Sequence, residues 1–145
     1  MGQYYYAVNL DKRQYLHPHK CGDGLKLMEF GLSSCGTMSC LAILLADGNG
    51  RGGGDLHSKN PIIGSWAGDR IVITGDYADD GKFIPEAHYP GIPSFQGNLQ
   101  SYASEHFEDI SIKAMKALAD DDYVRERLKD NLWFHEESKK EILGG

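Results

Sequence analysis

A glycine-rich tract, GNGRGGGD at residues 48–55, contains residue types that hold phosphate groups. Successive glycines expose backbone N–H groups that form an anion-binding nest, and an arginine guanidinium matches phosphate geometry. The tract lacks the Lys-Ser/Thr pair of a P-loop and follows an expected helix instead of preceding one, so neither phosphate-loop motif applies. The alternative is a flexible connection without a ligand. The residues expected to bind the anion are Arg51, Gly52, Gly53 and Gly54, with Asp55 available for a ribose hydroxyl.

The segment GSWAGDRIVITGDYAD at residues 64–79 supplies the rest of a nucleotide-sized set of side chains. Its β-branched run, residues 71–73, lies between two Gly-Asp pairs, which is typical of a buried strand whose ends closely approach another group. Aromatic side chains can stack a base, which is worth about 1–3 kcal/mol per base in nucleic-acid binders. We therefore predict one pocket that both segments share. Its further ligand-binding residues are Trp66 and Tyr77 for stacking, and Asp69, Arg70 and Asp76 for polar contacts.

The sequence HPHKC at residues 17–21 offers an alternative, a metal site. On a strand, the two histidines and the cysteine would point to one face, and imidazole and thiolate ligands suit zinc. The intervening proline disturbs strand geometry, however, and a polar edge strand with one buried cysteine explains the same residues. We therefore predict no bound metal and no cofactor. The alternative ligands are His17, His19, Cys21 and His57, with Asp55 as another choice for the fourth position.

Acidic residues cluster around the same β-branched run, at Asp69, Asp76, Asp79 and Asp80. Paired carboxylates can hold Mg²⁺ or Ca²⁺ and support hydrolysis of a phosphoester. A metal-dependent phosphoester hydrolase is therefore a second functional hypothesis, although we favour ordinary turn chemistry for these residues. No serine stands in a nucleophile motif, so we predict no catalytic residue. A thiol at a helix N-terminus is activated, which leaves Cys35 as an alternative nucleophile.

Length and composition predict a single domain over residues 1–145. The net charge of −6 argues against a nucleic-acid groove or an anionic membrane as partner, because both require an electropositive face. The three cysteines are few and odd in number, which argues against a disulfide scaffold and fits the reducing cytoplasm. No apolar stretch approaches the roughly 20 residues that span a bilayer.

The order of elements predicts the α+β class, with an antiparallel sheet and helices on one side. Aromatic and β-branched residues at 3–10 and 14–19 predict an N-terminal hairpin. A helix at 37–47 is apolar on all sides and is expected to be buried centrally. Two C-terminal helices should pack on one face. The remaining expectations are the caps Asp109 and Asp120 or Asp121, an irregular tract at 81–100, and a charged tail at 135–145 that is helical or frayed.

Three motifs resemble a small family of uncharacterised proteins from bacterial and phage genomes. They are MGQYY at the start, GLKLMEF at residues 24–30 and SWAGDRIVITGDYAD at residues 65–79. Phe30 stands where that pattern commonly has a His, and a strand separates the Trp from GDYAD. The resemblance covers roughly the first half of the chain, and it implies a compact bacterial or viral domain working in the cytoplasm, without carrying over an activity.

Taken together, these features favour non-enzymatic binding, or sequestration, of a small anionic ligand of the nucleotide type. In a phage, such a protein would act against host defence by removing a nucleotide signal. The hydrolase is one alternative. The other is a self-assembling interaction module, because Tyr, Trp and Arg dominate interface hot spots and the exposed edge of the hairpin could pair with a second copy.

Overall fold

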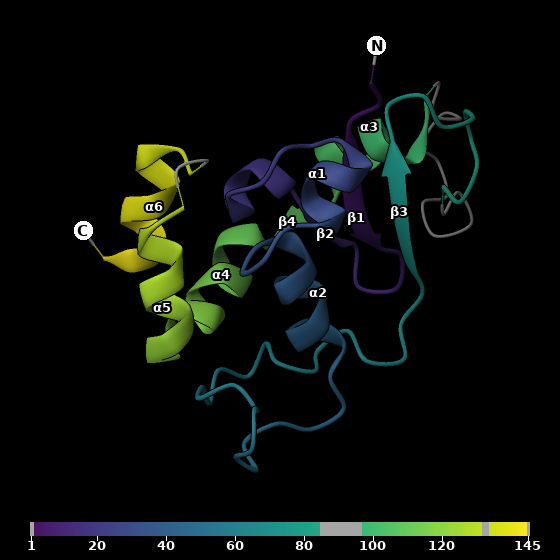
Figure 1. The fold of residues 1–145 in the computed structure, drawn as a ribbon. Helices are drawn as coiled ribbons and strands as arrows, with labels where there is room; N and C mark the ends of the chain where they lie inside the picture. The colour runs from purple at the N-terminus through teal and green to yellow at the C-terminus, as the bar shows by residue number, and fades with distance from the viewer. Residues whose placement is uncertain (1, 85–96, 132–133, 145) are drawn as a thin grey trace.

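A four-stranded β-sheet lies at the centre of the computed structural model, which describes residues 2–84, 97–131 and 134–144 (Figure 1). The strands are ordered β3-β1-β2-β4. The first two pairs are antiparallel, whereas β2 and β4 are parallel. The strands are β1 (Tyr5–Asn9), β2 (Gln14–Leu16), β3 (Ile71–Gly75) and β4 (Glu108–Asp109).

Strand β1 is central because both of its faces are apolar. Ala7 and Val8 point to opposite faces and are both fully buried. In the register with β3, Ala7 lies opposite Ile73 and Val8 lies opposite Val72. A strand buried on both faces needs a layer of structure on each side of the sheet.

The helices provide these two layers. On one face, α2 and α4 enclose the larger core, together with the short helix η1. On the other face, α3 covers Val8, Tyr15 and Val72. The helical elements are η1 (Pro18–Cys21), α1 (Leu27–Gly31), α2 (Thr37–Leu45), α3 (Leu99–His106), α4 (Ser111–Ala119), α5 (Asp122–Lys129) and α6 (Glu136–Leu143).

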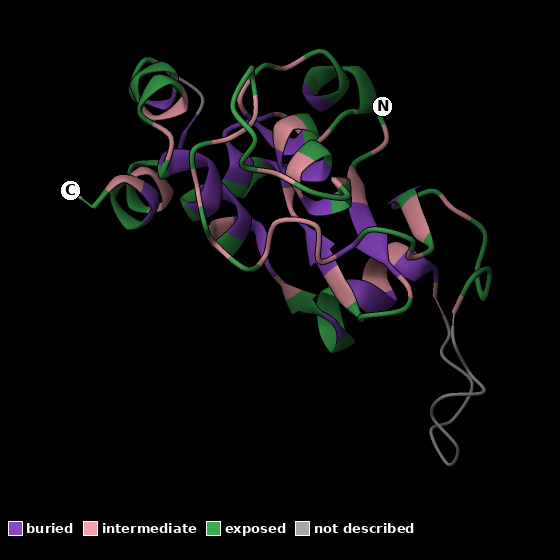
Figure 2. Cartoon of the chain, turned by 90° about the horizontal axis from the view of Figure 1, so that it is seen from below, coloured by how far each residue is buried: buried purple, intermediate pink, exposed green. Residues whose placement is uncertain are grey.

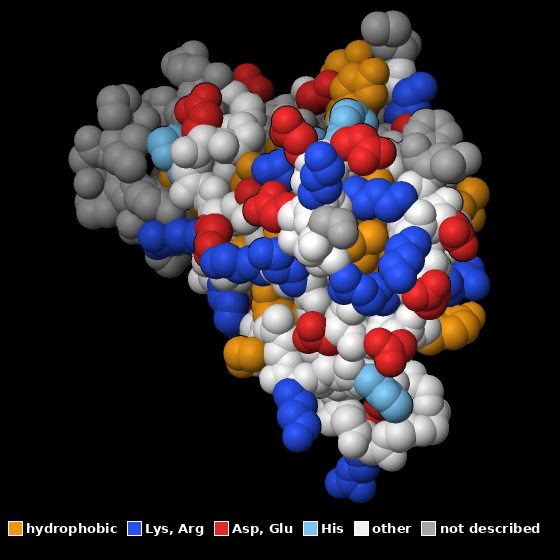
Figure 3. Space-filling model, turned by 90° about the vertical axis from the view of Figure 1, so that its left-hand side faces the viewer, with side chains coloured by type: hydrophobic (Ala, Val, Ile, Leu, Met, Phe, Trp, Pro, Cys, Tyr) orange, Lys and Arg blue, Asp and Glu red, His pale blue; other side chains and the backbone are white. Residues whose placement is uncertain are grey.

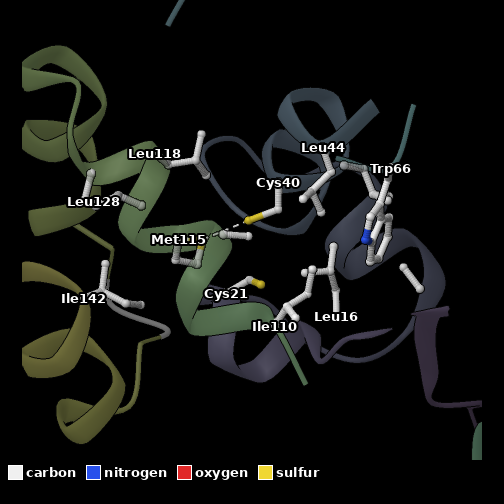
Figure 4. Packing of buried hydrophobic residues seen from close by; sticks show 14 of the residues in the cluster. Leu16, Cys21, Cys40, Leu44, Trp66, Ile110, Met115, Leu118, Leu128 and Ile142 are labelled. Atoms are coloured by element: carbon white, nitrogen blue, oxygen red, sulfur yellow. Dashed lines mark hydrogen bonds between the residues drawn. The ribbon is translucent and has the colours of Figure 1, made fainter. Parts of the chain in front are cut away.

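The larger core is built from residues that are far apart in the chain (Figure 4). Trp66 and Leu44 pack at its sheet end, and the thiol of Cys40 lies 3.2 Å from the sulfur of Met115. Burial raises the pKa of Cys40 well above the ordinary value for a thiol. Cys21 lies in the same cluster, and all three cysteines are free.

Helices α5 and α6 pack against α4 at one end of the molecule (Figure 1). The carboxylate of Asp121 accepts hydrogen bonds from the backbone N–H groups of Tyr123 and Val124, which makes it the N-cap of α5. Helix α6 packs against α4 through buried Ile142, and most of its remaining surface is exposed (Figure 2). The expected tail therefore forms a helix docked on the core.

The structure confirms the α+β class and corrects several details. The sheet is mixed, since β4 pairs parallel to β2, and α3 covers the face that was expected to be bare. Helix α2 is half buried, because Met38 and Leu45 are 38% and 41% exposed. Asp109 contributes to the start of α4 through Ser111, although Ile110 is the N-cap. Of the expected irregular tract, residues 85–96 lie outside the described part, and α3 begins at Leu99.

The helices of the described part are short. The two with the most residues, α2 and α4, have nine each. Within residues 2–84, 97–131 and 134–144, no helix has both the length and the apolar character that crossing a membrane requires.

Candidate functional site

The residues predicted to bind a nucleotide lie in three separate places. The glycine tract belongs to the long loop that follows α2, whereas Asp76 and Tyr77 follow the far end of β3 (Figure 1). Trp66, Asp69 and Arg70 lie in the segment before β3. Of the three pockets described for this structure, two include residues of the glycine tract, and none also includes a predicted residue of the segment at 64–79.

The glycine tract is closed by its own side chains. The backbone N–H of Arg51 donates to a carboxylate oxygen of Asp55 at 2.8 Å. The amide of Asn49 accepts the backbone N–H of Leu56 and donates to its carbonyl, both at 2.9 Å. The tract thus holds an anion, but the anion is an internal carboxylate. A positive φ at all five of its glycines permits this turn, at Gly48, Gly50, Gly52, Gly53 and Gly54.

A cavity of about 840 Å³ lies between this loop, α2 and the start of α5. Its inner wall is apolar, and its rim carries four carboxylates and one exposed tyrosine, Tyr123. Because like charges repel, this concentration of carboxylates disfavours an anionic ligand. The rim carboxylates belong to Asp55, Asp120, Asp121 and Asp122.

Trp66 is part of the core and is not available for base stacking. Its side chain has no exposed surface. The indole N–H donates to the side-chain carbonyl of Gln14 at 2.8 Å, and the backbone N–H donates to the carbonyl of Leu44 at 2.8 Å. The residue therefore joins the start of β2 to the end of α2.

Asp69 and Arg70 fasten the β1–β2 turn to the segment before β3. Asp69 accepts hydrogen bonds from Asn9 at 2.9 Å and from Lys12 at 2.6 Å. Arg70 donates through Nε and Nη2 to Asp11 at 3.0 and 2.8 Å. These bonds lower the pKa of both carboxyl groups below the ordinary value of 3.8. The main cause is the hydrogen bond from Asn9 for the pKa of Asp69, and the hydrogen bond from Arg70 for the pKa of Asp11.

We expect the fold to lose stability in acid through these two carboxylates. A depressed folded-state pKa contributes stability that is fully present above the unfolded value, 3.8, and is lost as the pH falls through the lower folded-state pKa. Thermal melts between about pH 2 and pH 6 should therefore show a falling melting temperature below about pH 4. Asp69→Asn should flatten that fall, and an unchanged slope in this variant would contradict the prediction.

Asp76 and Tyr77 lie at the opposite end of β3. Asp76 accepts the backbone N–H of Tyr4 at 2.9 Å, which fixes the entry to β1. Tyr77 is 63% exposed. The pair retains open surface, but none of the pockets described for this structure includes either residue.

The expected metal ligands are not on a strand. The strand β2 ends at Leu16, and residues 18–21 form η1, so the alternation that would align the ligands does not apply. The rings of His17 and His19 lie 5.7 Å apart, whereas Cys21 is fully buried in the larger core. Among the described residues, no group of three His, Cys, Asp or Glu side chains could hold a metal ion. His57 instead donates its backbone N–H to Asp121.

A second cavity, of about 620 Å³, lies between the segment before α2 and helix α5. Sequence reasoning identified only one of its residues, Cys35, as an alternative nucleophile. None of the others was predicted as a site residue, although Gly24 and Glu29 belong to the GLKLMEF motif, and the lining comes from three separate segments. The polar lining consists of Asp23, Glu29, Ser33, Ser34, Cys35, Arg127, Asp130 and Asn131, and the apolar lining includes Leu32 and Leu128. We call this the Cys35–Arg127 cleft.

A buried carboxylate shapes the inner wall of the Cys35–Arg127 cleft. Asp23 accepts the backbone N–H and the hydroxyl of Thr37, both at 2.7 Å, at the first turn of α2. Burial raises the pKa of Asp23, and its bonds to Thr37 and Ser33 act in the opposite direction. A Cβ on Gly36 would stand 2.4 Å from an Asp23 oxygen, so only glycine admits this close approach.

The cleft brings a thiol and a guanidinium together from positions 35 and 127. Cys35 has a φ of +60°, which is uncommon for a residue with a side chain and places its thiol in the turn before α2. A hydrogen bond with the Cys35 side chain is the main cause that raises the pKa of Arg127. The ring of Tyr123 also lies 5.8 Å from the guanidinium carbon. Arg127 is exposed, so its guanidinium lies at the mouth of the cleft, near the thiol of Cys35 and the ring of Tyr123.

Two of the carboxylates that line the cleft already accept hydrogen bonds from other residues of the protein. Asp23 is committed to the start of α2, and a carboxylate oxygen of Glu29 accepts the backbone N–H of Lys26 at 3.0 Å. Arg127 is the one cationic side chain in the lining. On the side of the molecule formed by α5 and α6, acidic and basic side chains are interspersed (Figure 3).

No family model matches the chain, and neither a curated protein nor a solved structure matches it.

Proposed function

We propose that the protein binds a small ligand with one anionic group, without turnover, in the Cys35–Arg127 cleft. The observation that carries the proposal is the guanidinium of Arg127, which lines a cavity with polar walls together with Cys35. The proposal keeps the small anionic ligand expected from the sequence, but the residue that binds its anionic group is Arg127 instead of Arg51.

The size and lining of the cleft support this class of ligand. Its volume of about 620 Å³ lies within the range of small-molecule sites. Ser33 and Ser34 offer hydroxyl groups for the polar body of a ligand, and Leu32 and Leu128 offer an apolar surface.

The charge balance favours one phosphate or carboxylate over a polyphosphate. A single guanidinium can pair with one such group in a bidentate manner. The carboxylates of Glu29 and Asp130 would repel further negative charge. A nucleoside monophosphate, or another ligand of that size and charge, fits better than a nucleoside triphosphate.

Binding is favoured over catalysis because the lining of the cleft contains no histidine next to the thiol. Sequestration of a nucleotide-derived signal in the cytoplasm, directed against host defence in a phage, is the role that we propose for such binding. The three free thiols fit a reducing compartment.

Alkylation of Cys35 tests the proposal. Cys21 and Cys40 have no exposed surface, so Cys35 is expected to react first in the folded protein. We expect Arg127 to favour the anionic reagent iodoacetate over neutral iodoacetamide, and Arg127→Gln to lower the ratio of the two rates about two- to fivefold, the range of an exposed charge pair. A nucleoside monophosphate should slow both reactions in the wild-type protein. The rates are measured by intact-protein mass spectrometry with peptide mapping.

Lys129→Gln is the matched control, because Lys129 is exposed on the same helix, pairs with Glu126 and does not line the cleft. It should leave the ratio of rates unchanged. An equal ratio in the wild-type protein and in Arg127→Gln would exclude Arg127 as the anchor. Absence of protection by any nucleoside monophosphate or small carboxylate would exclude the ligand class.

A further inference from the structure

The outer edge of β3 is the feature that the proposed function leaves unused. The order of the strands puts β3 at one edge of the sheet, with β1 as its neighbour (Figure 1). The hairpin edge that the sequence suggested for self-pairing is not free in this way, because β1 pairs with β3 and β2 pairs with β4.

The hydrogen bonds to β1 show which backbone groups of β3 face outward. The N–H of Leu10 donates to the carbonyl of Arg70, and the N–H of Asp76 donates to the carbonyl of Tyr4, both at 3.0 Å. Because the direction alternates along an antiparallel strand, even-numbered residues from 70 to 76 face β1 and the backbone groups of Ile71, Ile73 and Gly75 face outward.

The outward N–H groups of β3 are open to another strand, whereas the outward carbonyl of Gly75 already accepts the N–H of Ala78 at 3.1 Å. In the described part of the chain, the N–H groups of Ile71 and Ile73 have no hydrogen-bond partner. Edge strands are commonly blocked by a lysine, a proline or a bulge. The sequence of β3, IVITG, contains no charged residue and no proline, and the side chain of Ile73 is 39% exposed.

The charges at the two ends of β3 are arranged for pairing with a copy of itself. Arg70 precedes the strand and Asp76 follows it, each three residues from Ile73. In an antiparallel pair centred on Ile73, Arg70 lies directly opposite Asp76 of the second copy, at both ends of the pair. Opposite charges in directly opposed positions stabilise a pair of strands, and like charges destabilise it.

We propose that β3 pairs antiparallel with β3 of a second copy of this chain, across a two-fold axis at Ile73, to give one continuous sheet. Ile73 faces Ile73, and this pair exchanges its outward N–H and carbonyl groups. Ile71 faces Gly75, whose N–H donates to Ile71 and whose carbonyl, already the acceptor for the N–H of Ala78 at 3.1 Å, accepts the N–H of Ile71 on its second lone pair. Val72 faces Thr74, a β-branched pair. A closed two-fold contact of this kind gives a dimer and not a fibre.

Both charged residues have capacity left for the second copy. Arg70 uses Nε and Nη2 for Asp11, which leaves Nη1, and its side chain is 67% exposed. Asp76 uses Oδ1 for the N–H of Tyr4, which leaves Oδ2. A strand of five residues buries less surface than a permanent dimer does, so the association should be weak and dependent on concentration.

Light scattering after size exclusion tests the proposal, with the full chain over a range of concentrations. The mass of the wild-type protein should rise from 16.1 kDa toward twice that value. Ile73→Pro should hold it at 16.1 kDa, because proline removes an outward N–H and leaves the ladder to β1 intact. Thermal melts report whether the variant is folded.

Charge reversal keeps the test decisive if Ile73→Pro does not fold. Asp76→Arg places two arginines opposite each other. It should lower the association constant of the dimer by up to about tenfold, which is measured as a smaller dimer fraction at a given concentration. Adding Arg70→Asp to it exchanges the two charges and should restore dimerisation. A wild-type protein that remains monomeric at roughly 1 mM, the weak limit of useful association, overturns the proposal. So does a dimer that both Ile73→Pro and Asp76→Arg leave unchanged.

Discussion

Replacing Trp66 with alanine should lower the free energy of unfolding by about 3–5 kcal/mol, the usual cost of removing a large buried aromatic side chain. The side chain has no exposed surface, and it packs with Leu44 and Leu16 where α2 meets the sheet (Figure 4). Its removal also leaves the side-chain carbonyl of Gln14 without the indole N–H. Since single domains are stable by about 5–15 kcal/mol, the variant should be close to unfolding at 37 °C.

Urea titration followed by circular dichroism measures this loss without depending on tryptophan fluorescence. Trp66→Phe is the matched variant, because it keeps a ring in the core and loses the hydrogen bond to Gln14. We expect it to retain more than half of the stability that alanine removes. A loss below about 1 kcal/mol for Trp66→Ala would show that this residue is not part of the core.

Asp23→Ala should lower the free energy of unfolding by about 2–3 kcal/mol, because the backbone N–H and the hydroxyl of Thr37 lose a common acceptor in a buried position. The start of α2 and the inner wall of the Cys35–Arg127 cleft should loosen together. The measurement is the urea midpoint at neutral pH, with thiol reactivity of Cys35 as a local readout.

Asp23→Asn separates the shape of this side chain from its charge. Burial raises the folded-state pKa of Asp23, so the stability that its neutral form contributes is fully present below 3.8 and is lost as the pH rises through the folded-state pKa. The asparagine variant should lack this component and should be more stable than the alanine variant at neutral pH. If asparagine and alanine are equally destabilising at every pH, the amide does not replace the carboxylate as acceptor and the assigned role of Asp23 is wrong.

Local patterns were enough to predict much of the fold. The β-branched run at 71–73 forms the first three residues of β3, and Gly75 is the last residue of the strand. Asp121 caps α5 as its type and place suggested. The sequence gives no comparable signal for β4, a pair of acidic residues whose strand character comes entirely from pairing with β2. Helix α3, with the polar sequence LQSYASEH, is stabilised by packing on the sheet through Tyr102 and Ala103.

The site was harder to predict than the fold. The sequence does not reveal whether a hydrogen-bonding side chain or backbone group pairs with a ligand or with another residue of the protein. The glycine tract was expected to hold an external anion, and it holds Asp55. Arg70 was expected to contact a ligand, and it holds Asp11. The pairing of Cys35 with Arg127 depends on how α5 returns to the segment before α2, which no local motif specifies.

The parallel pairing of β2 with β4 also bears on when the protein can fold during synthesis. Gln14 pairs with Glu108 and Tyr15 with Asp109, so this contact joins residues 94 positions apart. The sheet cannot be completed until most of the chain has left the ribosome, and the apolar faces of β1 remain uncovered until then. Contacts that are this distant along the chain slow folding and prolong the exposure of nascent apolar surface to chaperones and to other chains.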